Sequence, residues 1–376
     1  MCKRFLFATF VSLLCSCAHE NTDVATVQMD GKIHGANEIR SVVQSVRTIP
    51  LEATDDVSLI GSSDKICRSR AGSFVILDRR IRKQVYAFDS TGRFMNLIGR
   101  CGRGPSEYTV PYDIAVRGDS VFVLDPFMRR LLLYTIDGRY LSEVKMDIPV
   151  TEVALLGSSR FIGVNGDSSS SRTKGYDLSL FDEDGRFLQG LSRHSYTMNY
   201  TAHFCLSTFD GGAVYHKSLR PEIEYYNLEG KLSGKTALVF DGSMLPSDFE
   251  RQSKGDFNTL LRMYPLRGYS YFTGDYWRTP KYEGLVTSSK GQSLLSVRNL
   301  GTGEVKSFLA GYSFSGLSPD GRPLLDKDSY VVWALSRPVA VAGETVYCLI
   351  DASAPGMPVR PSALPANPSV VQIDFK

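Results

Sequence analysis

The sequence has 376 residues, of which 43% are hydrophobic, 11% aromatic and 22% charged, and its formal net charge is +3. This composition is ordinary for a globular protein with a sizeable hydrophobic core. A net charge so close to zero gives no electrostatic reason to bind nucleic acid, so we exclude that class of partner.

The first residues have the pattern of a secretory leader. Lys3 and Arg4 precede an apolar run, residues 5–14, that is too short to span a bilayer. The run ends in LCSC, residues 14–17, which resembles a bacterial lipobox and implies cleavage before Cys17 and acylation of that cysteine. We therefore expect a lipoprotein signal peptide at 1–16 and a polar, flexible tether at 17–40. The alternative is an ordinary secretory signal with cysteines there by chance.

A repeat dominates the rest of the chain. A turn glycine followed by a basic and then an apolar residue occurs at Gly92, Gly138, Gly185 and Gly230, at spacings of 46, 47 and 45 residues. Each glycine follows a polar turn and accepts the positive φ of a tight hairpin. A repeat of this length, filled with strands and lacking helices, predicts the four-stranded blades of a β-propeller. The alternative is a β-sandwich whose hairpins look alike by chance.

The periodicity predicts six blades within residues 41–376, with strands a to d running from the axis outward. The expected blades occupy residues 62–98, 109–145, 150–191, 202–240, 269–309 and 330–375. In the last blade, 330–335 is the expected inner strand and a fourth strand is missing. We expect residues 41–51 to supply that strand and so close the ring, which protects the strand edges.

Two segments interrupt the period. Residues 241–268 are an insert in which Ser247 and Glu250 match a helix capping box, so we expect a short helix there. The proline-rich residues 352–368 predict an extended loop. A seventh blade hidden within the irregular residues 241–280 is the alternative to six.

One motif resembles a known family. The sequence GRGPSEY, residues 102–108, is similar to the inter-blade turn of bacterial six-bladed β-propeller lipoproteins, which are related to the NHL and TolB-like propellers. Here Ser106 replaces the usual glycine. The resemblance implies a propeller fold and a lipid-anchored location at the outer membrane or elsewhere in the cell envelope, and it implies no catalytic residues.

The order of strands predicts which loops share a face. In a propeller, the d–a connections and b–c loops form one rim, here called the b–c rim, and the a–b and c–d turns form the other, the a–b rim. Basic residues recur in the b–c loops, whereas acidic residues recur in the c–d turns. We expect a basic rim that attracts anions. Its candidate ligand-binding residues are Arg79, Arg82, Arg129, Arg130, Arg172 and Arg220.

A second candidate site is aromatic. Tyr276, Trp277 and Arg278 lie off the regular strand pattern, and we expect them to be exposed, as the aromatic side chains of sugar-binding sites often are. The histidines show no metal-ligand spacing, and no nucleophile elbow, P-loop or dinucleotide motif is present. We therefore expect no metal and no cofactor.

These observations predict a lipid-anchored envelope propeller that binds a ligand or a protein partner, with acidic glycans as the candidate ligand. The alternative is a propeller enzyme, a lyase or hydrolase, acting on acidic saccharides in the axial pocket. A scaffold subunit of an outer-membrane assembly is a third possibility. Converging acid and base pairs along the axis favour the enzyme, whereas aromatic residues and arginines alone favour binding.

Overall fold

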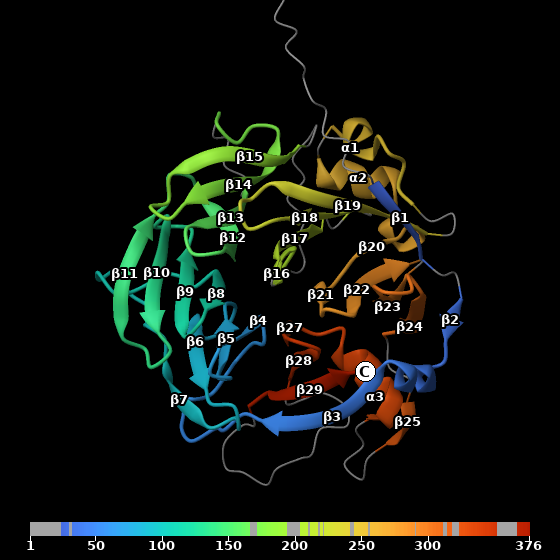
Figure 1. Cartoon of the computed structure of the whole chain (residues 1–376), viewed down its shortest axis with the longest axis horizontal. Helices are drawn as coiled ribbons and strands as arrows, with labels where there is room; N and C mark the ends of the chain where they lie inside the picture. Colours follow the sequence, from blue (N-terminus) through green and yellow to red (C-terminus); the bar gives the residue numbers. More distant parts are fainter. Residues whose placement is uncertain are drawn as a thin grey trace, which may run out of the picture.

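Six β-sheets stand around a common axis, which confirms the predicted all-β, six-bladed propeller (Figure 1). The computed structural model describes residues 24–29, 32–165, 171–193, 204–209, 211–216, 219–220, 222–240, 244–254, 256–289, 291–310, 314–317, 323–351 and 367–376.

Blades 1 to 3 each have four antiparallel strands in sequential order, with strand a nearest the axis. Both faces of a blade pack against neighbouring blades, so every residue of the second strand of blade 1 is buried. Blade 1 consists of β4 (Lys65–Arg68), β5 (Phe74–Asp78), β6 (Gln84–Phe88) and β7 (Phe94–Leu97). Blade 2 consists of β8 (Asp113–Arg117), β9 (Ser120–Asp125), β10 (Arg130–Thr135) and β11 (Tyr140–Lys145). Blade 3 consists of β12 (Val150–Leu156), β13 (Arg160–Asn165), β14 (Tyr176–Asp182) and β15 (Phe187–Arg193).

Blades 4 and 5 follow the same plan with local changes. The inner strand of blade 5 is split into two short pieces that both pair with β22. Blade 4 consists of β16 (Leu206–Phe209), β17 (Gly212–His216), β18 (Glu222–Tyr226) and β19 (Leu232–Val239). Blade 5 consists of β20 (Tyr271–Phe272) with β21 (Trp277–Arg278), then β22 (Tyr282–Ser289), β23 (Gln292–Asn299) and β24 (Val305–Leu309).

The inner strand of blade 6 is not the predicted one. Residues 330–335 belong largely to a helix, α3 (Lys327–Ala334), and the inner strand is β27 (Val339–Ala342). The helix forms because the side chain of Asp326 accepts hydrogen bonds from the backbone N–H groups of the next turn, a typical N-cap. Its apolar residues, including Trp333, are buried against the blade and therefore look like a strand in the sequence. β28 (Thr345–Ile350) is the second strand of the blade.

The ring is closed by an early part of the chain. β3 (Val43–Pro50) pairs antiparallel with β29 (Ser369–Phe375), which confirms the predicted closure by residues 41–51. Buried side chains from both sides of the junction, such as Tyr347 and Phe74, form one hydrophobic cluster. Each of the other five junctions between blades has a cluster of its own, so closure adds a sixth.

The segment before β3 differs from the flexible tether expected at 17–40. β1 (Val24–Gln28) adds a parallel fifth strand to β19 of blade 4, and β2 (Ile33–His34) pairs in parallel with β24 of blade 5. The 3-10 helix η1 (Ala36–Ser41) then leads into β3, and its Ile39 is buried. β1, β2 and β3 thus lie on the outer edges of three successive blades, as the blue strands in Figure 1 show.

The repeated glycines have a packing role in addition to their turn conformation. Gly92 and Gly185 lie in c–d turns with φ near +89° and +81°. A Cβ on Gly92 would lie 2.3 Å from the backbone oxygen of Pro50, and one on Gly185 would lie 2.4 Å from that of Lys145. Both oxygens belong to the outer strand of the preceding blade, so glycine permits neighbouring blades to approach closely.

The insert at 241–268 forms two short helices rather than a seventh blade within the described residues. These are α1 (Phe249–Gln252) and α2 (Phe257–Met263), followed by the 3-10 helix η2 (Leu266–Gly268). Phe249 and Leu260 pack together in a small cluster on the edge of the ring. A further hairpin joins β25 (Phe314–Leu317) to β26 (Pro323–Leu325). In the part of the chain that the structure describes, no helix is long and apolar enough to cross a membrane.

Candidate ligand-binding cavity on the propeller axis

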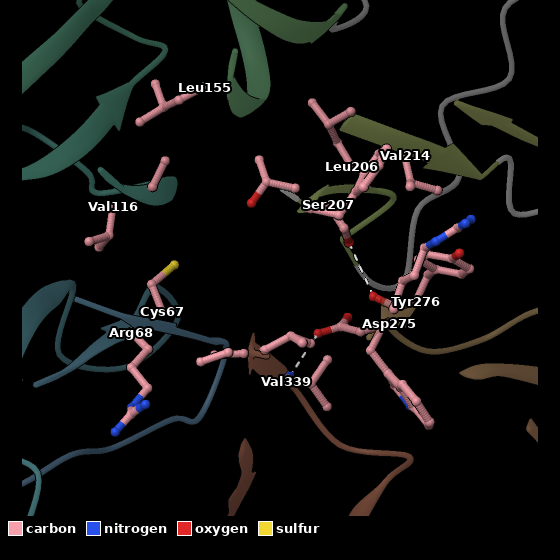
Figure 2. Close-up of a pocket in the computed structure, with 18 of the residues that line it drawn as sticks. Cys67, Arg68, Val116, Leu155, Leu206, Ser207, Val214, Asp275, Tyr276 and Val339 are labelled. Atoms are coloured by element: carbon pink, nitrogen blue, oxygen red, sulfur yellow. Dashed lines mark hydrogen bonds between the residues drawn. The ribbon is translucent and has the colours of Figure 1, made fainter. Parts of the chain in front are cut away.

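A cavity of about 740 Å³ lies on the axis, and the inner strands of all six blades line it. Figure 2 shows side chains from these strands arranged around one open space. The cavity runs from the first residues of the inner strands, at the b–c rim, to their last residues, at the a–b rim. The side chains at these two ends differ in chemistry.

At the b–c end, a buried ion pair joins the first residues of two inner strands. Lys65 of β4 places its Nζ 2.6 Å from Oδ1 of Asp113 of β8, whose side chain is fully buried. The backbone N–H of Val153 in β12 donates to the other oxygen, Oδ2, at 2.8 Å. Burial is the largest single effect and opposes the charge of Lys65, but the attraction of Asp113, together with smaller contributions from Cys67 and Glu152, outweighs it and raises the pKa of the lysine. This ion pair therefore links three successive blades.

Two more carboxylates at this end connect neighbouring blades. Glu152 of β12 accepts hydrogen bonds from the backbone N–H groups of Cys205 and Leu206, both at 2.9 Å. Asp275, just before β21, accepts one from the N–H of Val339 at 3.3 Å (Figure 2). Burial raises the pKa of each carboxyl group to about 7, and the charge of Lys65 opposes both shifts.

An aromatic ring covers Lys65. The ring centroid of Phe204 lies 4.8 Å from Nζ of Lys65 and 5.0 Å from Cζ of Arg79. Arg79 also lies over the ring of Tyr112, at 4.8 Å. Alternating cations and rings therefore stack beside the axis at the b–c rim.

At the a–b end, three arginines terminate inner strands and stack on aromatic rings. Cζ of Arg68 lies 4.2 Å from the ring centroid of Tyr347, and Cζ of Arg117 lies 5.4 Å from that of Phe122. Arg278 lies over a third ring, that of Tyr225, at 5.1 Å. All three arginines line the cavity. Stacking fixes each guanidinium plane while leaving its N–H groups able to donate.

The three arginines differ in their charge partners. Arg278 lies 3.7 Å from the buried carboxylate of Glu283; burial opposes its charge, but Tyr276 and Glu283 together raise its pKa. Arg117 donates to the backbone oxygen of Ser158 at 3.0 Å, and burial lowers its pKa. Within the described residues, neither Arg68 nor Arg117 has a carboxylate within ion-pair distance. Two cations at the cavity wall therefore lack a counter-ion from the chain itself.

The predicted rim arginines do not line this cavity. Several already have acidic partners: Arg82 pairs with Asp56 at 2.9 Å, and Arg172 with Asp147 at 3.1 Å. Arg130 is buried and pairs with Glu143 at 3.0 Å. Of the remaining three predicted rim residues, Arg79 lies in the same b–c loop as Arg82, Arg129 directly precedes Arg130, and Arg220 lies in the b–c loop of blade 4.

The predicted aromatic site is partly corrected. Tyr276 and Trp277 are 2% and 1% exposed, so they are core residues rather than an exposed platform. The Tyr276 hydroxyl donates to Glu283 at 2.6 Å. These two rings are buried because the split inner strand of blade 5 turns them against its neighbours. All three predicted residues, Tyr276, Trp277 and Arg278, nevertheless contribute to the wall of the cavity.

The GRGPSEY motif acts within its own turn. Glu107 accepts from Nε of Arg100 at 2.6 Å and from the backbone N–H of Gly104 at 2.8 Å. Tyr108 is fully buried and its hydroxyl donates to the backbone oxygen of Ile98 at 3.0 Å. These contacts give the motif a structural role at the step from blade 1 to blade 2.

Comparison with known proteins places this fold in a family. Residues 27–324 match a family described as a domain of unknown function, DUF4934. The chain belongs to this family. A search of curated proteins found no match.

Several solved structures are similar to this DUF4934 protein. An exported protein from Bacteroides fragilis has a TM-score of 0.72 at 14% identity, over 94% of this chain and 99% of that one. A member of the DUF4221 family from Bacteroides vulgatus has a TM-score of 0.48 at 11% identity, over 89% and 97% of the two chains. BamB from Moraxella catarrhalis has a TM-score of 0.38 at 12% identity, over 89% of this chain and 99% of that one. At these identities, likeness shows the fold alone.

Sequence reasoning missed most of the cavity residues of the DUF4934 protein. Arg68 and Arg117 occupy equivalent positions in their blades, each in the last residue of an inner strand. An arginine that recurs at the end of an inner strand could have indicated the cavity. The prediction considered the basic residues of the loops instead. Among the described residues, no group of three or more His, Cys, Asp and Glu side chains could hold a metal ion.

Proposed function

We propose that this DUF4934 protein is a cell-envelope binding module that takes a small anionic ligand into its axial cavity. One observation carries the proposal: Arg68 and Arg117 belong to the cavity wall and are held on aromatic rings, with no carboxylate partner from the described chain. A guanidinium group binds carboxylate, sulfate or phosphate through two parallel hydrogen bonds. An anionic group between these two arginines would supply the missing counter-charge.

The cavity suits a ligand larger than a simple ion. Its volume of about 740 Å³ falls within the usual range for small-molecule sites. The polar residues Ser207 and Thr208 also line it, so neutral polar groups of a ligand have candidate partners as well. An acidic saccharide combines both features, and we retain it as the ligand class.

The cavity is a better candidate than the rim because of charge pairing. The rim cations Arg82, Arg130 and Arg172 already have acidic partners, so an incoming anion would have to displace those carboxylates. Exposed ion pairs with water access are also weak, about 1 kcal/mol or less. Binding at Arg68 and Arg117 displaces no carboxylate.

The enzyme alternative receives less support from the cavity wall. Glycoside hydrolysis usually requires two carboxyl groups, about 5–9.5 Å apart, around the scissile bond. Among the described residues that line the cavity, Asp275 is the single carboxylic acid, and it already accepts a hydrogen bond from the N–H of Val339. This arrangement favours binding over hydrolysis.

Calorimetry with the protein would test the proposed ligand site. We expect a galacturonate oligosaccharide to bind and the matching neutral galactose oligosaccharide to bind at least tenfold more weakly. Arg68→Met and Arg117→Met keep the apolar stem and remove the charge, so each should weaken acidic binding about tenfold, whereas Arg82→Met on the rim serves as a matched control. Equal affinity for both sugars, or equal effects of cavity and rim substitutions, would contradict the proposal.

The envelope location is also part of the proposal. The similar Bacteroides fragilis structure is described as an exported protein, and the leader of this chain resembles a lipoprotein signal. Cys17 lies outside the described residues, and we propose it as the lipid attachment site. Cys17→Ala should release the protein from membranes, whereas Cys15→Ala should not. A Cys17→Ala protein that still carries lipid by mass spectrometry would refute the assignment.

A further inference from the structure

Large apolar side chains stand exposed on the b–c rim of blades 1 and 2. Ile81, in the b–c loop of blade 1, is 64% exposed, and Phe127, in that of blade 2, is 70% exposed. Met128 and Val57 are exposed beside them. Single exposed apolar residues are ordinary, but a group on neighbouring loops is typical of an interaction site. We call these four residues the tip surface.

The two loops hold these side chains outward in a fixed conformation. The buried carboxylate of Asp78 accepts from the backbone N–H of Ile81 at 3.0 Å, and that of Asp125 accepts from the N–H of Met128 at 3.2 Å. Both loops end in a non-glycine residue with positive φ, 53° at Lys83 and 51° at Arg129. The same construction in both blades shows that the exposed tips are built into the fold rather than left over from a mobile loop.

Contacts connect the segments that carry the tip surface. Arg79, from the blade 1 loop, lies over the ring of Tyr112, and that ring lies 6.5 Å from the ring of Phe127. On the other side, Arg82 pairs with Asp56, which precedes Val57 in the chain. Arg79 and Tyr112 therefore connect the two loops that carry the apolar tips.

Positive charge borders the patch. Lys83 and Arg129 are exposed, and neither makes an ion pair or side-chain hydrogen bond within the described residues. An apolar patch beside unpaired cations is complementary to apolar residues flanked by acidic ones. Two copies joined through this patch would bring these cations together, so charge disfavours a second copy as the occupant.

The path of the chain disfavours the membrane as the occupant; this step rests on the anchor proposed above. β1 runs parallel to β19, which begins at the a–b rim, so the chain enters β1 from that side. Six residues lie between Cys17 and Val24, so the distance between these two residues is at most about 25 Å. An anchor so short attaches the protein by its a–b side, while the tip surface is on the opposite rim.

We propose that the tip surface docks an acidic, apolar segment of a partner protein. The apolar residues of that segment cover Ile81, Phe127 and Met128, and its carboxylates pair with Lys83 and Arg129. The arginines proposed to bind the ligand are at the a–b end of the cavity, whereas the tip surface is on the b–c rim, so ligand and partner can be bound together.

Site-specific photo-crosslinking in the native host tests the proposal with the full chain. The photoreactive residue replaces Phe127, and Leu141, which is exposed on β11 of the same blade, is the matched control position. We expect a protein adduct at position 127 at least tenfold above that at 141. Mass spectrometry of the adduct should place the crosslink in a segment with more acidic than basic residues.

Charge reversal then tests the chemistry of recognition. Lys83→Glu with Arg129→Glu should lower the adduct at position 127 at least tenfold. Arg139→Glu, an exposed arginine in the c–d turn of the same blade, should leave it unchanged. An adduct with lipid or with a second copy, no excess over position 141, a basic contact segment, or indifference to the charge reversal would each overturn the proposal. None of these readouts depends on ligand binding in the cavity, so the two proposals fail independently.

Discussion

The two ends of the propeller axis hold charged residues in opposite ways. At the b–c end, the carboxylates of Asp113 and Glu152 are buried, and each accepts hydrogen bonds from the backbone of the next blade. At the a–b end, Arg68 and Arg117 rest on aromatic rings and lack carboxylate partners within the described residues. Buried charge with complete partners fixes a structure, whereas charge without partners at a cavity wall is available for a ligand. The first residues of the inner strands therefore stabilise the fold, whereas their last residues are available to bind a ligand.

The largest effect should follow from breaking the buried ion pair at the b–c end. Asp113→Ala leaves the ammonium of Lys65 buried without its partner and removes the acceptor for Val153 N–H. We expect a loss of about 3–5 kcal/mol in the free energy of unfolding, measured by denaturant titration. The double variant Lys65→Met with Asp113→Asn removes both charges but keeps an acceptor oxygen, so it should recover more than half of that loss. A single variant as stable as the natural protein would show that this end does not hold the blades together.

A smaller effect should appear as a pH dependence of stability. The pKa of Glu152 is raised from its ordinary value of 4.5 to about 7 in the folded protein. Between these two pH values, the folded protein keeps the proton of Glu152, whereas the unfolded chain has lost it. Stability should therefore fall as pH rises through this window, by up to about 3 kcal/mol from this residue. Asp275, whose pKa is also raised to about 7, acts in the same direction.

The matched variant for the pH dependence is Glu152→Gln, which cannot ionise. Chemical denaturation between pH 5 and pH 7.5 should show a clearly shallower slope for this variant than for the natural protein. The remaining slope should reflect Asp275. A slope that the substitution leaves unchanged would mean that Glu152 is already ionised in the folded protein at pH 5.

The sequence predicted the arrangement of blades better than it predicted the site. Glycines such as Gly92 and Gly185 recur because each lies against the backbone of the preceding blade, a requirement that every blade shares. Because every blade has the same requirement, the glycine recurs at regular spacing and the repeat can be recognised in the sequence. The helix α3 was missed because its buried apolar run resembles a strand, and only the cap at Asp326 distinguishes it.

The cavity could not be predicted in the same way because it depends on contacts between blades. Arg68 of blade 1 stacks on Tyr347 of blade 6, a residue 279 positions later in the chain. The rim prediction counted the charge of Arg172 without the acid that neutralises it, Asp147, which lies in the connection between two other strands. Charge along a sequence does not show which groups are paired in space.

The smallest effect should come from the exposed ion pairs of the b–c rim, and it completes the comparison with the axis. The side chains of Arg82 and Asp56 are 39% and 79% exposed, so water screens their attraction and replaces either partner when it is removed. We expect Arg82→Ala to change the free energy of unfolding by no more than about 1 kcal/mol, and a double-mutant cycle with Asp56→Ala to give a coupling of about 0.5 kcal/mol that fades with salt. The pair of Lys65 and Asp113 should show several times that coupling and little dependence on salt, because the carboxylate has no contact with solvent. Similar couplings for the two pairs would mean that burial at the axis does not distinguish them.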